Sequence, residues 1–266
     1  MTLWQGAFLG LVQGLTEFLP VSSSGHLVLA EALAGIKTPG VFVEVLLHVA
    51  TLGSVLIVYG RRLGAVALGV ARGRREDVRY ALLLVVATVP AGVLGVLLHD
   101  AVARAFDSLL FVGVAFGLTG VVLWSTRRVV RAPAAASPSP VPTGLGAVVI
   151  GLAQAVAILP GISRSGSTVS AALWCRLEPT RAAEFSFLIA IPVIGGAALL
   201  EARGAMADLA AVGALPLGVS CIVALASGIW AIRFLVALLR RGRFYAFAPY
   251  CWSVGAFTIL YALWRG

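Results

Sequence analysis

Charged side chains are scarce in this sequence: 20 basic and 11 acidic residues make up only 12% of its 266 residues. Soluble globular domains carry about 25% charged residues. Hydrophobic residues account for 60% of the chain, and a protein of this length has too little interior to hide that much apolar surface from water. The composition therefore excludes a soluble enzyme, a nucleic-acid-binding protein and a disordered chain, and it predicts an integral membrane protein.

Lysine and cysteine are also rare. Lys37 stands against 19 arginines, and the cysteines are only three, Cys175, Cys221 and Cys251. The cysteines lie singly in apolar stretches without a CxxC pair, so we expect small buried hydrophobic residues rather than a disulfide framework or a zinc site. The first residues lack a basic region and an A-x-A site, so we expect no cleavable signal peptide.

Apolar runs indicate how the chain crosses the membrane, since a spanning helix needs about 20 apolar residues. Six runs are long enough: residues 41–60, 80–98, 109–125, 185–200, 209–232 and 244–264. Two further stretches, 3–19 and 145–159, each end at a proline and a serine-rich segment, and shorter apolar segments follow at 26–35 and 168–177. Helix, break and short helix predict a re-entrant hairpin. The predicted fold is an all-α integral membrane protein with six transmembrane helices and two re-entrant helical hairpins.

Basic residues predict the orientation. Thirteen of the 20 lie in segments 61–79, 127–131 and 233–243, which six alternating helices place on one side of the membrane. The other side receives Lys37, Arg104, Arg203 and Arg265. The positive-inside rule then puts the arginine-rich segments in the cytoplasm and both termini outside.

The two halves of the chain resemble each other. Residues 10–27 align without gaps on 151–168, with six identical pairs: Gly10/Gly151, Leu11/Leu152, Gln13/Gln154, Ser22/Ser163, Ser24/Ser165 and Gly25/Gly166. Three spans separate the two hairpins, so the copies enter from opposite faces. We therefore predict one membrane domain built as an inverted-topology repeat. Its parts are a first half at 1–131, a flexible Pro-, Ala- and Ser-rich linker at 132–143 and a second half at 144–266.

Polar residues in apolar segments are costly and mark function by default. In the first hairpin they gather around the break: Gln13, Glu17, Ser22, Ser23, Ser24 and His26. Gln13 and Glu17 are four residues apart and share one face of a helix. The free N–H groups at the start of the next helix attract an anion. The alternative is that the serines only cap that helix and Glu17 lies at the membrane interface.

Arg164 dominates the second hairpin. It lies at the break, among the hydroxyl residues Ser163, Ser165 and Thr168. Its planar fork suits phosphate oxygens, and the hydroxyls can add neutral donors. The alternative is an interfacial arginine that reaches the lipid headgroups.

Together the two clusters provide the parts for binding and cleaving a phosphate ester or anhydride, a reaction that depends on positioning and charge neutralisation. Glu17, with Gln13, could hold a divalent cation that bridges phosphate oxygens. His26 or a serine would act as nucleophile or general acid/base. We expect the neighbouring polar residues to bind the substrate: Gln13, Ser22, Ser24, Ser163, Ser165 and Thr168.

At this point a family resemblance is visible. QGLTEFLPVSSSGH and PGISRSGST resemble the two signature motifs of the bacitracin-resistance family of undecaprenyl-diphosphate phosphatases, and the similarity extends to EFSFLIAIPVIGGA and to the layout of the spans. The resemblance implies an enzyme of the bacterial inner membrane that removes the terminal phosphate of undecaprenyl diphosphate. That reaction recycles the lipid carrier for peptidoglycan and raises tolerance to bacitracin. The active site is expected to face the outer side.

The resemblance also implies roles, residue by residue. The catalytic residues would be Ser23, His26, Glu17 and Arg164, with Ser23 favoured as nucleophile, His26 as its base and Arg164 as the clamp on the diphosphate. It further implies a magnesium or calcium ion at Glu17 and Gln13. Because Gln13 is neutral where the motif also allows glutamate, such an ion would depend mainly on Glu17. The sequence leaves open whether Ser23 or His26 is the nucleophile. It also leaves open whether the protein forms a homodimer.

The residues alone are also compatible with other functions. A secondary transporter is favoured by the repeat, since such proteins place broken helices at the membrane midplane, and the same anion site could carry a lipid phosphate across. A purely structural membrane protein does not explain Glu17 and Arg164 in apolar segments. Glu44 and His48, four residues apart in the first span, either line the site from the side or form an ordinary polar helix end.

Overall fold

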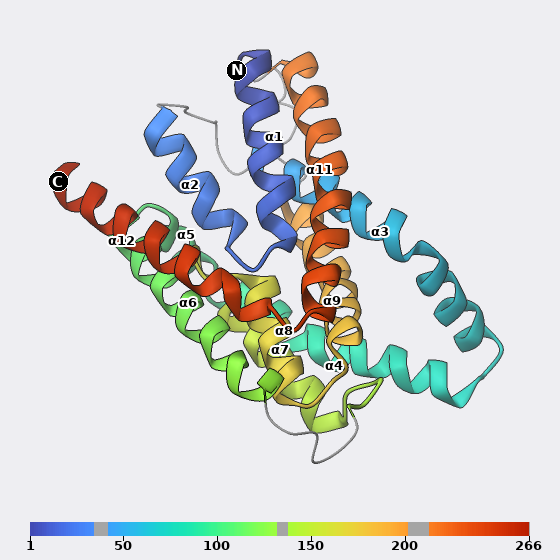
Figure 1. Cartoon of the computed structure of the whole chain (residues 1–266). Coiled ribbons are helices and arrows are strands. Elements are labelled where there is room, and N and C mark those ends of the chain that lie inside the picture. Colours follow the sequence, from blue (N-terminus) through green and yellow to red (C-terminus); the bar gives the residue numbers. More distant parts are fainter. Residues whose placement is uncertain (35–41, 132–137, 202–212, 266) are drawn as a thin grey trace.

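The structure is a computed structural model that describes residues 1–34, 42–131, 138–201 and 213–265. These residues form helices, and an isolated bridge between Ser139 and Leu177 is the only strand-like pairing among them. The helices are α1 (Leu3–Phe18), α2 (Ser23–Ala34), α3 (Phe42–Ala71), α4 (Arg75–Leu97), α5 (His99–Phe106), α6 (Leu109–Arg131), α7 (Gly144–Val156), α8 (Arg164–Trp174), α9 (Pro179–Glu201), α11 (Ala214–Arg240), the 3-10 turn η2 (Phe244–Phe247) and α12 (Ala248–Arg265) (Figure 1).

Six segments of the described chain are long and apolar enough to cross a membrane, which confirms the predicted number: α3, α4, α6, α9, α11, and η2 with α12. Their ends differ from the prediction. α3 continues to Ala71 and α11 to Arg240, so Arg61, Arg62 and Arg233 lie on helices and not in loops. These helices continue past the end of the apolar run, because a long arginine side chain on a helix can still reach water.

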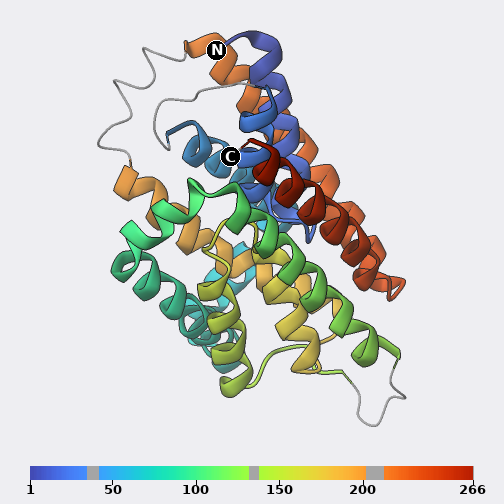
Figure 2. The ribbon, with the colours of Figure 1, turned by 90° about the vertical axis from the view of Figure 1, so that its left-hand side faces the viewer.

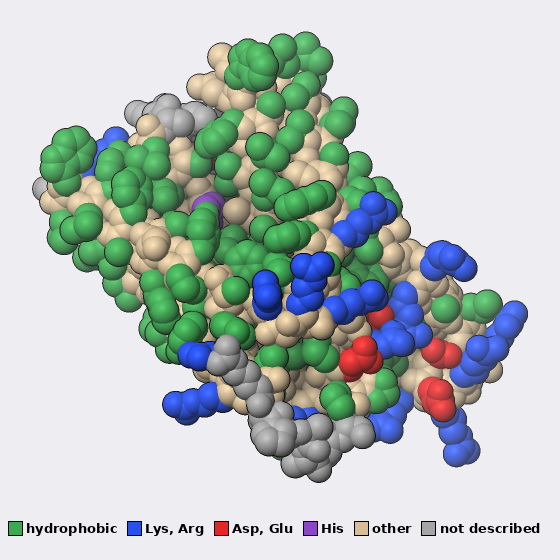
Figure 3. All heavy atoms as spheres, viewed as in Figure 1, with side chains coloured by type: hydrophobic (Ala, Val, Ile, Leu, Met, Phe, Trp, Pro, Cys, Tyr) green, Lys and Arg blue, Asp and Glu red, His purple; other side chains and the backbone are tan. Residues whose placement is uncertain are grey.

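The outer surface of the bundle is apolar. On α4 one face exposes Leu82, Val85, Val89, Val93 and Val96, each at least 50% accessible. Figure 3 shows hydrophobic side chains over most of one face, while arginines gather toward the lower right, away from both termini. Such a surface is stable in lipid and not in water. The structure therefore supports a multi-pass membrane protein.

The tips of two short helical hairpins meet near the centre of the molecule. α1 with α2 and α7 with α8 each fold back on themselves, and their tips meet (Figure 1). α1 packs along α11, and α7 packs along α4, while α6 and α12 run side by side (Figure 2). The first two pairs correspond to each other: exchanging the two halves of the chain would place α1 on α7 and α11 on α4. The re-entrant path through a bilayer and the inverted repeat themselves stay predictions.

Glycine allows the closest of these helix contacts. A Cβ on Gly10 or Gly14 of α1 would collide with backbone atoms of α11 at Ser220 and Ala224. On α7 a Cβ on Gly151 would lie 2.8 Å from the carbonyl oxygen of Ala87 in α4. Small residues at such crossings let two backbones approach within a membrane. The aligned residues Gly10 and Gly151 thus both allow a close helix contact, one in each hairpin.

The segment 132–143 is only partly the flexible linker that its composition predicts. Residues 132–137 lie outside the described chain. Ser139 is anchored: its N–H donates to the carbonyl of Arg176 and its carbonyl accepts from the N–H of Glu178, both at 2.9 Å. This pairing fixes the later part of the linker against the residues that follow α8.

Cysteine burial differs among the three residues. All are free; Cys251 is buried, whereas Cys175 and Cys221 are only half-buried. The expectation of small buried hydrophobic residues is therefore correct for Cys251 and only partly so for the other two.

Candidate active site

The carboxylate of Glu17 is the centre of a buried polar cluster. The residue is only 4% exposed, although it carries a formal charge. Its Oε2 accepts hydrogen bonds from Gln13 Nε2 at 2.9 Å and from Ser23 Oγ at 2.5 Å. His48 Nε2 lies 3.3 Å from the same oxygen, and the guanidinium of Arg164 pairs with Oε1. A buried charge needs such partners, and here they come from four different helices.

A tight turn brings Ser23 back to Glu17. α1 ends at Phe18, and Ser22 adopts a left-handed conformation with φ of 67° before α2 begins at Ser23. This conformation is rare for a residue with a side chain. It reverses the chain within four residues, so the first hydroxyl of α2 meets the last carboxylate of α1.

A similar turn positions Arg164. Gly161 has φ of 89°, and Ser163 caps α8 by accepting a hydrogen bond from the N–H of Gly166 at 3.0 Å. Thr119 of α6 holds this turn, since its hydroxyl donates to the Gly161 carbonyl and accepts from the Ser163 N–H, each at 3.0 Å. Arg164 is thereby fixed as the first residue of its helix.

The two hairpin tips are in direct contact. Ser165 Oγ donates to the carbonyl of Leu19 at 3.0 Å, and a Cβ on Gly25 would lie 2.9 Å from Cα of Gly161. The N-termini of α2 and α8 therefore lie next to each other. Each carries unpaired N–H groups and the positive end of a helix dipole, so this meeting point suits an anion.

Aligned residues of the two hairpins make matching hydrogen bonds. Ser22 and Ser163 each accept from the N–H three residues on, at 3.4 and 3.0 Å, and each lies near the hydroxyl two residues on, at 3.4 and 3.3 Å. The next position differs, because Ser23 in the first hairpin corresponds to Arg164 in the second. The same backbone position thus offers a hydroxyl from one side and a guanidinium from the other.

His26 is not placed where the sequence suggests. Its Nδ1 lies 2.7 Å from the carbonyl oxygen of Ser22 and its Nε2 lies 2.7 Å from the hydroxyl of Tyr250. The expected pairing of Ser23 with His26 is not formed, since Ser23 donates to Glu17 instead. The helical turn at the start of α2 directs the imidazole back to Ser22 and outward to α12. Tyr250 follows His26 by 224 residues, and no local pattern in the sequence marks it.

Hydroxyls of the second hairpin serve the fold as well as the cluster. Thr168 Oγ1 donates to the Arg164 carbonyl at 2.8 Å and lies 2.5 Å from Ser186 Oγ of α9, so it is turned away from Glu17. Ser163 acts as a helix cap, as described above. Of the predicted phosphate donors in this hairpin, Arg164 alone contacts Glu17 among the described residues.

An apolar pocket of about 370 Å³ lies between α1 and α2. Its lining is hydrophobic apart from one imidazole: Phe8, Val12, Leu29, Ala30, Leu33 and His26. His26, whose Nδ1 lies 2.7 Å from the Ser22 carbonyl oxygen, connects this lining to the turn before α2.

The cluster has few ligands for a metal ion. Within the described residues no three His, Cys, Asp or Glu side chains come together. Two residues offer oxygen ligands, Glu17 through its carboxylate and Gln13 through Oε1, which is buried without a hydrogen-bond partner in the part of the chain that the structure describes. Magnesium is often held by one or two protein oxygens, with water and substrate phosphates completing its shell. The donor set therefore fits such an ion.

Comparison with known proteins gives a consistent result. The family model described as bacitracin resistance protein BacA matches residues 6–257. A protein of Desulfosudis oleivorans named undecaprenyl-diphosphatase is 43% identical over 98% of both chains. Proteins of the same name from Desulforapulum autotrophicum and Desulfatibacillum aliphaticivorans are 38% and 40% identical, over 98% and 96% of both chains.

Proposed function

Because the chain belongs to the BacA family of bacitracin resistance proteins, we propose that it hydrolyses undecaprenyl diphosphate to undecaprenyl phosphate and inorganic phosphate at the Glu17 cluster. One observation carries the assignment of the site. A serine hydroxyl bonded to a buried carboxylate stands beside an arginine and two helix N-termini. These groups supply a nucleophile, its base and an anion clamp within one cluster.

In the proposed reaction Ser23 Oγ attacks the terminal phosphorus, and Glu17 takes the hydroxyl proton. The bond between the terminal phosphorus and the bridging oxygen breaks, and undecaprenyl phosphate leaves with the electron pair. Water then attacks the phosphoserine, which releases inorganic phosphate and restores the hydroxyl. Arg164 uses the donors that Glu17 leaves free to hold the phosphate oxygens.

Charge balance supports a divalent cation at this site. The positive charge of Arg164 is offset by Glu17, so the diphosphate would meet little net positive charge from this pair. Glu17 and Gln13 are the residues that would hold the ion, and when bound it would neutralise charge on the phosphate oxygens.

The apolar pocket between α1 and α2 supports a lipid substrate. Its lining includes His26 in the first turn of α2, so a polyprenyl chain in the pocket would place its diphosphate near Ser23. We assign the first isoprene units to this pocket and the rest of the chain to the surrounding lipid.

Purified protein in detergent should release inorganic phosphate from undecaprenyl diphosphate, with undecaprenyl phosphate as the second product. Phosphate detection and chromatography of the lipid measure both products. Ser23→Ala is the matched variant and should lose at least about 10²-fold in rate. A transporter without hydrolytic activity would bind the lipid and release no phosphate.

His48 is expected to position Glu17, since its Nε2 faces the carboxylate and its Nδ1 lies 2.7 Å from the Glu44 carbonyl oxygen. His48→Leu should lower kcat about tenfold, the cost of one hydrogen bond to a charged group. His48→Gln keeps an N–H donor and should restore most of the activity. Equal losses in both variants would show that the imidazole does more than hold the carboxylate.

We also propose that both termini and the mouth of the site face the outer side of a bacterial inner membrane. The arginine-rich ends of α3, α4 and α11 then lie in the cytoplasm. A C-terminal alkaline phosphatase fusion should be active in cells, because that enzyme folds only after export. A stable but inactive fusion would reverse the orientation.

A further inference from the structure

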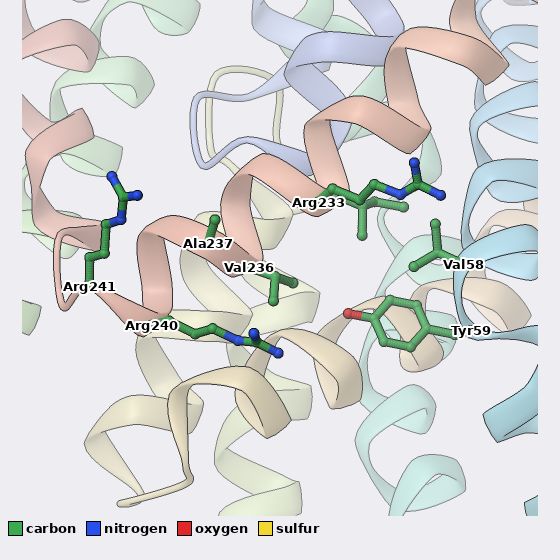
Figure 4. A pocket seen from close by; sticks show the side chains of 8 residues that line it. Val58, Tyr59, Arg233, Val236, Ala237, Arg240 and Arg241 are labelled. Atoms are coloured by element: carbon green, nitrogen blue, oxygen red, sulfur yellow. The ribbon is translucent and has the colours of Figure 1, made fainter.

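A cavity of about 500 Å³ lies between α3 and α11 at the arginine-rich end of the molecule, and the proposed reaction does not use it (Figure 4). Apolar side chains and arginines line it together, among them Val58, Tyr59, Val236, Arg233, Arg240 and Arg241. In Figure 4 the side chains of Arg233 and Arg240 extend toward α3 and the Tyr59 ring, whereas the guanidinium of Arg241 points away.

The arginines are arranged along one face of α11. Arg233, Ala237 and Arg240 are spaced four and three residues apart, which places them on a common stripe of the helix. Ala237 also lines the cavity, and its short side chain adds little bulk beside the two arginines. Like charges on one stripe repel each other, so this arrangement favours an anion between them.

Orientation in the membrane does not explain this arrangement by itself. The positive-inside rule requires basic residues near the cytoplasmic side, but it sets no pattern among them. Other arginines at this end are paired: Arg62 and Arg181 bind Glu184 at 3.0 and 2.9 Å. Arg233, Arg240 and Arg241 are all exposed and form no ion pair with the described residues.

The cavity also borders the surface that faces lipid. Ile57, next to Val58 on α3, is 59% exposed, and Phe234, next to Arg233 on α11, is 38% exposed. Large apolar residues exposed on spanning helices contact acyl chains. A ligand here therefore meets hydrocarbon on one side and guanidinium groups on the other.

We propose that this cavity binds the headgroup of an anionic phospholipid from the cytoplasmic leaflet. The phosphodiester lies between Arg233 and Arg240, whose planar forks match phosphate oxygens. The acyl chains pass over Val58 and Val236 into the bilayer. Basic pockets between spanning helices on the cytoplasmic side are a known mode of lipid headgroup binding. Inorganic phosphate is also an anion, but it has no apolar part that could contact Val58 and Val236.

The test uses the full-length protein purified in detergent and titrated with phosphatidylglycerol or phosphatidylcholine in mixed micelles. Native mass spectrometry measures the fraction of protein that retains one lipid. We expect preferential retention of phosphatidylglycerol. Arg233→Gln with Arg240→Gln should weaken it about 25-fold, from about fivefold for each arginine near an anionic lipid. Ala237→Leu keeps the charge but fills the cavity, and it should weaken retention as well.

The matched control removes two positive charges from another place at the arginine-rich end of the molecule. Arg72→Gln with Arg74→Gln changes two exposed arginines between α3 and α4, and it should leave retention nearly unchanged. Phosphate release from undecaprenyl diphosphate verifies that each variant is folded. Equal losses in both double variants, or no lipid preference in the unaltered protein, would overturn the proposal. Competition by millimolar inorganic phosphate would assign the cavity to a soluble anion instead.

Discussion

Arg164→Ala should abolish phosphate release from undecaprenyl diphosphate, with a loss of at least about 10³-fold in kcat/KM, the range observed when an arginine that contacts a transferring phosphoryl group is removed. The guanidinium has five N–H donors, and only Nη2 has a partner among the described residues. The remaining donors, next to the N-termini of α2 and α8, are the strongest anion-binding groups of the site. Arg164→Lys keeps the charge but loses the fork, so it should recover little of the activity.

A loss of stability must be separated from this loss of catalysis. Removing Arg164 leaves the Glu17 carboxylate buried without its cation, which costs about 3–5 kcal/mol for a broken buried pair. We therefore expect Arg164→Ala to lower the Tm, and Arg164→Ala combined with Glu17→Gln to regain part of it. The double variant should stay inactive. Arg128→Ala, which removes an exposed arginine from α6, is the control and should change neither property. Near-normal turnover in a folded Arg164→Ala protein would contradict the clamp.

The spans and the polar clusters could be predicted from the sequence because each depends on local composition. Twenty apolar residues in a row have few alternatives to crossing a bilayer. A charge in such a run is so costly that Glu17 and Arg164 stand out without a structure. Even the match between the hairpins was visible, since the caps at Ser22 and Ser163 require the same small polar residues.

Contacts between distant segments could not be predicted. The sequence suggests Ser23 with His26 because they are three residues apart, but the turn at Ser22 brings Ser23 to Glu17 and leaves the imidazole to Tyr250. The sequence leaves His48 either lining the site or at a polar helix end, and α3 places its Nε2 beside Glu17. Helix ends also differ from the prediction. Arg233 reads as a loop residue in hydropathy, yet α11 continues through it, and the cavity beside α3 follows from that continuation.

Glu17→Gln should lower kcat by about 10²–10⁴-fold, the contribution of a positioned general base. The substitution keeps the size of the side chain and removes the negative charge that accepts the Ser23 proton. The loss should persist at saturating magnesium or calcium, because more cation does not restore a base. Full recovery at high cation concentration would show that Glu17 acts only as a metal ligand.

The cation dependence itself provides the second half of this prediction. Glu17→Gln should raise the cation concentration needed for half-maximal residual activity, whereas Gln13→Glu adds a carboxylate beside Glu17 and should lower that concentration. The control is Gln154→Met: Gln154 aligns with Gln13, but its amide donates to the Ala87 carbonyl at 3.2 Å and it does not contact Glu17. That variant should affect the Tm and leave the titration unchanged. If neither Glu17→Gln nor Gln13→Glu moves the midpoint, the ion is not held at these residues, because an ion bound by an oxygen responds to the charge on that oxygen.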